Sequence, residues 1–300
     1  MSLLIPVLID TDANNEIDDQ HAIAYALFSR NHLEVVGITV NNTPLGKGIQ
    51  GHFDEAERVV RLCGCEDQVK VFKGAEKNFS DIAPRIQDST FDGKEAVDFI
   101  VDQAKVERET PLVLIPIGKL TNIALALTVA PEIREKVRIV WLGSNYPDKG
   151  EYNLIADPES VNVVLESRAP FEIVTVRYVE TTGSAAVRIT KDAIQRGMPG
   201  LGPQVKAVEG RHGGQFKCFG DYSVNLFENF PRDPWSLFDV VAVAVVKDPT
   251  LGEYSEINVP RLDQQVWLHG SPQTFKVGMW EQFNSEGVIE DLFDTMKYQI

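Results

Sequence analysis

Four aspartates lie close together near the N-terminus, at Asp10, Asp12, Asp18 and Asp19. The apolar run at residues 5–9 leads directly into the first pair and predicts a buried strand, and a segment with helical spacing begins at the second pair. Alternation along the strand puts the first pair on one side of it, and the helix start brings the second pair back towards them. Carboxylates this close repel one another unless protons or a cation compensate. Because calcium and magnesium bind oxygen ligands, the pattern predicts a metal centre at the end of this strand.

Three other patterns share part of this acidic segment. Asp18 and Asp19 could simply cap a helix, whose N-terminal dipole favours anions, but capping leaves the acids at the strand end unexplained. An EF-hand begins with a similar spacing of ligands, but it needs glycine where Asn15 stands and glutamate where His21 stands. A haloacid-dehalogenase-type phosphatase also starts with a strand and Asp-x-Asp and uses the first aspartate as a nucleophile. Its later lysine and second acidic pair are not evident, so it is the minor alternative.

Length and charge limit the partners. The 300-residue chain carries 44 acidic against 29 basic residues, a net charge of -15, which argues against nucleic acid as a ligand. A small neutral substrate, or one held through a cation, is compatible with this charge. No apolar run approaches the roughly 20 residues that span a bilayer, which argues against membrane insertion. We therefore predict a cytoplasmic protein that binds a small molecule.

The elements that must position the acids alternate along the chain. Apolar runs that predict buried strands lie at residues 5–9, 35–40, 69–72, 112–117, 139–142 and 173–176. Segments with helical spacing lie between them, at residues 21–28, 55–62, 96–104, 122–129 and 158–165. Such alternation predicts an α/β fold with an open, mostly parallel Rossmann-like sheet flanked by helices, in a single domain over residues 1–300. A glycine-rich segment at 181–234, an apolar helix at 237–246 and peripheral strands within 256–276 complete the prediction.

Around the aspartates the chain resembles the inosine-uridine-preferring nucleoside hydrolase family, whose signature is a strand followed by Asp-x-Asp and then a paired aspartate. Similar blocks follow in the order of the family: Val-Gly-Ile-Thr-Val-Asn at 36–41, Leu-Ile-Pro-Ile-Gly-Lys-Leu-Thr-Asn at 114–122, Asn145, Glu-Tyr-Asn at 151–153, Asp-Pro-Glu at 157–159 and Leu-Phe-Asp at 237–239. The resemblance therefore extends over most of the chain and implies the nucleoside hydrolase fold.

The resemblance also implies roles for single residues. Ca²⁺ would be bound by Asp12, Asp19 and Asp239 and by the backbone carbonyl of Ile117. Asp12 would in addition act as the base that activates a calcium-bound water, because a dication lowers the pKa of bound water. The substrate would be held by a further set: Asp18 and Asn153 on the ribose hydroxyls, Asn145 and Glu151 at the far end of the sugar, and Asn41, Asp239 and Phe238 at other points of the pocket.

Two departures from the family pattern concern substrate specificity. Five residues separate Asp12 from Asp18, whereas the usual family loop is two residues shorter and contains Pro-Gly. Asn14, Asn15 or Glu16 could supply new substrate contacts there, or the insertion could be a solvated bulge. The second departure is Phe238, because many family members place at this point a histidine that protonates the departing purine.

A phenylalanine donates no proton, although it can stack on a ring or close an apolar pocket. His212, in the glycine-rich segment expected over the site, is the best substitute acid, because its ordinary pKa lies near neutrality. A surface histidine without a catalytic role is the competing interpretation of His212. Under that interpretation, the leaving group departs without the acid that a histidine at position 238 would supply.

The leading prediction is a calcium-dependent hydrolase of N-glycosidic bonds in ribonucleosides or related ribosyl compounds. A second hypothesis, motivated by Phe238, is a calcium-dependent ribose- or sugar-binding protein that has lost efficient turnover. A third is a hydrolase of another glycoside in carbohydrate metabolism. The resemblance further implies a homodimer or homotetramer.

Overall fold

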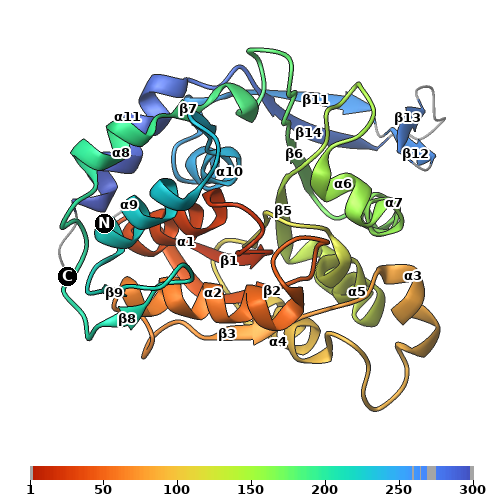
Figure 1. Cartoon of the computed structure of the whole chain (residues 1–300). Helices are drawn as coiled ribbons and strands as arrows, with labels where there is room; N and C mark the ends of the chain where they lie inside the picture. The colour runs from red at the N-terminus through yellow and green to blue at the C-terminus, as the bar shows by residue number, and fades with distance from the viewer. Residues whose placement is uncertain (1–2, 259, 264, 269–274, 298–300) are drawn as a thin grey trace.

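The computed structural model describes residues 3–258, 260–263, 265–268 and 275–297. At its centre is an eight-stranded sheet in the order β11-β14-β6-β5-β4-β1-β2-β3 (Figure 1). Neighbouring strands pair in parallel except β11, which runs antiparallel to β14. The strands are β1 (Ile5–Thr11), β2 (Leu33–Val40), β3 (Val71–Lys73), β4 (Leu112–Pro116), β5 (Val137–Leu142), β6 (Phe171–Val174), β11 (Glu253–Asn258) and β14 (Lys276–Glu281).

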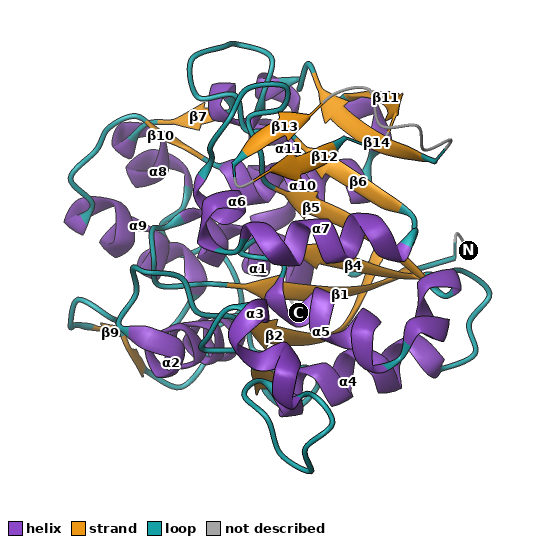
Figure 2. Ribbon diagram, turned by 90° about the vertical axis from the view of Figure 1, so that its right-hand side faces the viewer, coloured by secondary structure: helices purple, strands orange, loops and turns teal. Residues whose placement is uncertain are grey.

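Successive residues of the strands point into two apolar cores, one on each face of the sheet. In β1, Val7 and Ile9 belong to one core and Leu8 to the other, as the alternation of a strand requires. The first core is covered by α1 (Asp18–Phe28), α2 (Gly48–Leu62), α10 (Phe238–Lys247) and α11 (Ser285–Met296). The second is covered by α4 (Lys94–Lys105), α5 (Thr121–Val129) and α7 (Pro158–Ser167), which lie in front of the sheet in Figure 2. Within the described ranges, no helix is long and apolar enough to cross a membrane.

The strand order reverses at β1, which pairs with β2 on one side and with β4 on the other. The chain leaves the carboxyl end of β2 in one direction and the carboxyl end of β4 in the opposite direction. In an open α/β sheet, ligands bind where the connections diverge in this way. Asp10 lies there, opposite Thr39 of β2 and Pro116 of β4. The fold therefore places the aspartate segment at its most favourable position for a ligand site.

The predicted fold class is confirmed, and each predicted strand and helix overlaps an observed one. The prediction of peripheral strands within 256–276 did not include β14, which begins at Lys276 and extends beyond this range. Although β12 (Arg261–Asp263) and β13 (Val266–Leu268) form a separate hairpin, β14 lies inside the main sheet between β11 and β6. A short run such as Lys-Val-Gly-Met-Trp-Glu does not reveal that β14 is buried on both faces. Its pairing partner β6 lies far away in the sequence, so local sequence does not indicate the place of β14 in the sheet either.

The glycine-rich segment contains α8 (Lys191–Gly197) and α9 (Phe219–Asn229), and buried polar contacts attach α9 to α1 and α2. The ring of His21 in α1 lies 2.7 Å from the Ser223 hydroxyl and 2.6 Å from the Ile17 carbonyl oxygen. The Tyr222 hydroxyl donates to the buried carboxylate of Glu55 in α2 at 2.6 Å. These contacts hold α9 against the helices at one side of the site, so His21 serves the packing here.

Candidate active site

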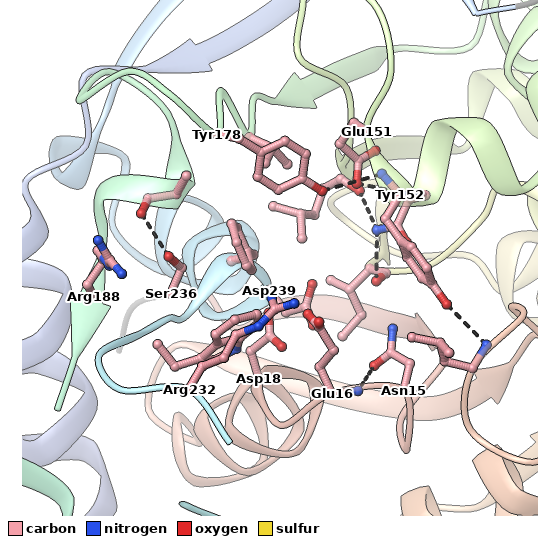
Figure 3. Close-up of a pocket in the computed structure, with 18 residues that line it drawn as sticks. Asn15, Glu16, Asp18, Glu151, Tyr152, Tyr178, Arg188, Arg232, Ser236 and Asp239 are labelled. Atoms are coloured by element: carbon pink, nitrogen blue, oxygen red, sulfur yellow. Dashed lines mark hydrogen bonds between the residues drawn. The ribbon is translucent and has the colours of Figure 1, made fainter. Parts of the chain in front are cut away.

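A pocket of about 500 Å³ opens beside the carboxyl ends of the central strands (Figure 3). Residues that line it come from the loops after β1 and β2, from the ends of β4 to β6, and from the segments at 151–153, 178–188 and 232–239. The lining residues are Asn15, Glu16, Asp18, Leu45, Ile117, Leu142, Glu151, Tyr152, Asn153, Val176, Tyr178, Ala185, Arg188, Arg232, Trp235, Ser236, Phe238 and Asp239.

Three buried aspartates converge beside this pocket, and two of them, Asp18 and Asp239, line it. Asp18 and Asp19 begin α1, Asp239 stands in the first turn of α10, and each offers a carboxylate oxygen within 4.8 Å of the other two. Two helix N-termini thus bring their positive dipole ends to the same point, which favours the charged form of these acids. Among the described residues, the converging set includes Asp18 in addition to the predicted ligands Asp19 and Asp239.

Asp12 adjoins this set, and one of its oxygens is unpaired. The Asp12 carboxylate is fully buried and accepts hydrogen bonds on Oδ2 from the Thr43 hydroxyl at 2.5 Å and from the Asn15 amide at 2.6 Å. Its Oδ1 has no partner among the described residues, and neither has Oδ2 of Asp19, whose Oδ1 accepts from the Thr11 hydroxyl. Two buried carboxylate oxygens without donors are unusual and call for a ligand.

Asp10 supports the site from below. Its carboxylate accepts from the Thr39 hydroxyl at 2.6 Å, from the Asn122 amide at 2.7 Å and from the Asn41 amide at 2.9 Å. Asn41, predicted as a substrate contact, is fully buried and does not line the pocket. Its amide links the end of β2 to Asp10, so its position indicates a role in holding the strand ends together.

Burial is the largest cause of the raised pKa values throughout the cluster. It raises the pKa of Asp12 and of Asp18 to about 6 and that of Asp10 to about 7. For Asp19 and Asp239 the pKa lies well above its ordinary value, because burial and the charges of the neighbouring aspartates act in the same direction. A bound divalent cation removes this penalty, since it stabilises the charged form of every acid around it.

On the sugar side, the structure joins three predicted residues through the start of α6 (Tyr152–Ala156). The Asn153 amide donates to the carbonyl oxygens of Ile117 at 3.2 Å and of Leu142 at 3.1 Å, which fixes it at the strand ends. The Glu151 carboxylate accepts from the backbone amides of Ser144, Asn153 and Leu154. Glu151 therefore caps α6 while it faces the pocket, and burial raises its pKa to about 7.

Asn145 and His212 do not line the pocket. The Asn145 side-chain oxygen is buried without a partner among the described residues, so its predicted sugar contact stays a prediction. His212 is exposed, and its Nε2 lies 3.1 Å from the Arg211 guanidinium nitrogen Nε. Sequence proximity to other site residues suggested His212, but the turn between β8 (Val208–Glu209) and β9 (Gln215–Phe216) carries it away.

The inserted loop at 13–17 is fixed in place from both sides. The Asn14 amide donates to the Gly46 carbonyl oxygen at 2.6 Å, and the Arg211 guanidinium donates to the Glu16 carbonyl oxygen at 2.7 Å. Asn15 and Glu16 line the pocket as a result. Of the two interpretations of the insertion, the loop as a source of substrate contacts is favoured by this position.

Aromatic rings and arginines form another wall of the pocket. The Phe238 ring meets Tyr178 edge-on at 6.0 Å and Trp235 at 5.8 Å between ring centroids. Short pairing of β10 (Trp235–Ser236) with β7 (Arg188–Ile189) places Arg188 on the same wall. Tyr178, Arg188 and Arg232 had no sequence signal, because each stands in a segment with neither a motif nor a clear periodicity.

Acids that converge on a ligand-sized pocket at the switch point of a parallel sheet define a hydrolase-type site fitted to a cation. Residues 7–281 match the family model described as inosine-uridine preferring nucleoside hydrolase. The chain belongs to this family, and it is a glycosidase that acts on N-glycosyl compounds.

Similar proteins agree with this assignment. The pyrimidine-specific ribonucleoside hydrolase RihA of Shewanella sp. strain ANA-3 is 28% identical over 274 residues, which cover 82% of this chain and 79% of that one. Among solved structures, the plant nucleoside hydrolase PpNRh1 superposes with a TM-score of 0.74 at 20% identity, covering 98% of this chain and 99% of that chain. A purine-preferring ribonucleoside hydrolase from Gardnerella vaginalis gives a TM-score of 0.71 at 22% identity, covering 97% and 98%. At these identities the structures support the fold alone.

Proposed function

We propose that the protein is a calcium-dependent hydrolase of N-glycosidic bonds in ribonucleosides or related ribosyl compounds, with Asp12 as the base that activates water. The observation that carries the proposal is the pair of unpartnered buried oxygens, Asp12 Oδ1 and Asp19 Oδ2, where the aspartates converge beside the pocket. Family membership supplies the reaction class, and the pocket of about 500 Å³ is large enough for a nucleoside.

The donor set suits a hard divalent cation. Asp12, Asp19 and Asp239, with the Ile117 carbonyl oxygen, would hold it, and Asp18 stands close enough to join them. All of these donors are oxygens, which calcium accepts in larger and more flexible numbers than magnesium does. When bound, the cation supplies positive charge that lowers the pKa of the attacking water.

The chain's own residues would do the remaining work. Asp12 takes the proton of the attacking water on its unpaired oxygen, Oδ1. Cleavage of an N-glycosidic bond passes through an oxocarbenium-like state, so carboxylates beside the ring stabilise its developing positive charge. Asp18 and Asn153 would bind ribose hydroxyls and Glu151 would contact the far end of the sugar, which their positions in the pocket lining support. Rigid attachment of Asn153 and Glu151 to the backbone lowers the cost of orienting them.

A sugar-binding protein without turnover is the alternative that Phe238 favours, because this side chain lines the pocket and cannot protonate a leaving group. Ribose release from a panel of purine and pyrimidine nucleosides and another glycoside, with calcium and after chelation, separates the two functions. We expect calcium-dependent release of ribose from at least one nucleoside. Tight calcium-dependent binding of ribose by calorimetry, with no product from any compound, would establish the binding protein instead.

His212→Ala is expected to change kcat and KM by less than about twofold, because the ring is exposed and lies outside the pocket. The Arg211 contact with the inserted loop uses a different guanidinium nitrogen from the one beside the imidazole. Steady-state rates with the best nucleoside of the panel provide the measurement. A loss of kcat of about tenfold or more would instead assign the proton donation to His212.

A further inference from the structure

The leaving-group end of the pocket lacks a histidine at position 238, so another group must accommodate the electron pair that the departing base receives. The polar side chains there are those of Glu16, Tyr178, Arg188, Arg232 and Ser236. A base leaves more easily when it is protonated or when fixed donors stabilise its negative charge. Four of these side chains can be judged by what they already contact, and Glu16 is tested by substitution below.

Three of them are already engaged. The Ser236 hydroxyl donates to the Ala185 carbonyl oxygen at 2.8 Å, and Arg188 donates to the Pro234 carbonyl oxygen at 3.3 Å. The Tyr178 hydroxyl accepts from the Tyr152 backbone amide at 3.4 Å, and burial raises its pKa further above the ordinary value for tyrosine. Tyr178 is therefore a poor proton donor in this position.

The Arg232 guanidinium lies over an aromatic ring and still has its N–H donors available. Its guanidinium carbon lies 5.1 Å from the centre of the Trp235 ring, an arrangement in which a cation is attracted to the ring face. Trp235 in turn packs edge-on against Phe238. Among the residues that the structure describes, the guanidinium forms no ion pair or hydrogen bond, and Figure 3 shows it directed towards Asp18 and Glu16. A guanidinium keeps its proton at all working pH values and offers five N–H donors in one plane.

We propose that Arg232 binds the departing base and stabilises the negative charge that develops on it, in the place of a proton-donating histidine; this inference rests on the function proposed above. In the step, the bond between C1′ and the base nitrogen breaks and its electron pair stays on the nitrogen. The water oxygen bonds to C1′, one water proton passes to Asp12, and Arg232 keeps its own protons. The base takes up the balancing proton from solvent after it leaves the pocket.

This assignment also narrows the substrate class. A guanidinium beside the leaving group favours bases that carry carbonyl oxygens near the glycosidic nitrogen, because these oxygens accept the N–H donors and share the negative charge. The rings of Trp235, Phe238 and Tyr178 provide a surface for a flat heterocycle. An oxo-substituted pyrimidine or purine riboside is the substrate with the matching chemistry.

The test compares two ribosides that differ in how much help the leaving group needs. Uridine releases a poor leaving group, whereas 4-nitrophenyl riboside releases a phenolate that departs unaided. Arg232→Ala is expected to lower kcat about 100-fold on uridine and less than about threefold on 4-nitrophenyl riboside. Arg232→Lys keeps a charge but loses the planar set of N–H donors, so its kcat on uridine should lie between those of the wild type and of Arg232→Ala. The control is Arg196→Ala, whose side chain pairs with Asp192 at the surface of α8 and should leave both rates unchanged.

Several outcomes separate the proposals. Equal losses on both substrates with Arg232→Ala and Arg232→Lys, or a change in KM alone, would overturn the role of Arg232 and leave the proposed function intact. If Glu16→Gln lowers kcat on uridine alone and Arg232→Ala does not, the role belongs to Glu16 instead. A wild-type protein that hydrolyses neither riboside in the presence of calcium contradicts the proposed function, and this inference falls with it.

Discussion

Asp12→Asn is expected to lower kcat for ribose release by about 10³-fold, with a much smaller change in KM, because the amide cannot take a proton from water. Asparagine has nearly the same shape and still offers one oxygen to the donors Thr43 and Asn15. The substitution therefore removes the charge and the base but keeps the packing. Initial rates at saturating nucleoside, with calcium held in excess, provide the measurement.

The matched control is Asp98→Asn, since Asp98 is exposed on α4 and, in the described part of the chain, pairs only with Lys94 on its own helix. Rates of this variant should equal those of the wild type. Folding of the Asp12 variant is checked by thermal unfolding without metal, where it should be at least as stable as the wild type, because one of several mutually repelling buried charges is gone. A kcat for Asp12→Asn within about threefold of the wild type would refute Asp12 as the base.

Calcium should stabilise the folded protein strongly near pH 8 and weakly near pH 5. In the absence of a cation, burial raises the pKa of Asp12 and Asp18 from 3.8 to about 6, so the folded state holds protons that the unfolded chain has already lost. Stability therefore falls as the pH rises from about 4 to 6 and stays low above it. Glu151, with a pKa of about 7, contributes in the same direction.

His21 acts in the opposite direction. Burial lowers its pKa from 6.5 to about 4, so its contribution to stability is present above pH 6.5 and is lost as the pH falls towards 4. Burial also lowers the pKa of His52 and of His212, but the carboxyl groups with raised pKa values outnumber these imidazoles, so we expect the cation-free protein to be less stable at pH 8 than near pH 5. Binding of a cation requires charged carboxylates, so the stabilisation that it provides grows over the same interval.

Thermal unfolding with calcium, with magnesium and with a chelator measures this effect. At a free calcium concentration 100 times its Kd, the gain is about 2.7 kcal/mol, which corresponds to a rise in Tm of several degrees. Asp239→Asn should abolish most of the gain, whereas Asp98→Asn should keep it. An identical Tm with calcium and with chelator at pH 8 would show that the aspartates bind no cation, and a larger shift with magnesium would reassign the ion.

The sequence predicted the central architecture because parallel strands buried on both faces leave continuous apolar runs. The runs that became β1, β2, β4, β5 and β6 are of this kind. It missed the place of β14 and did not predict α11, since strand order depends on pairing between segments far apart in the chain. Local periodicity carries no information about such pairing.

For the site, the sequence by itself determined the aspartate segment, its position after a strand and the oxygen chemistry that it supplies, since these follow from residue type and local spacing. Only the tertiary structure decided which acids converge: Asp18 joins Asp19 and Asp239, and Asp10 is occupied by three donors. It also placed Arg232 on the wall of the pocket and His212 outside the pocket. The reason is that both stand in the loops of one long segment, and the direction in which a loop carries a side chain is set by what its neighbours pack against.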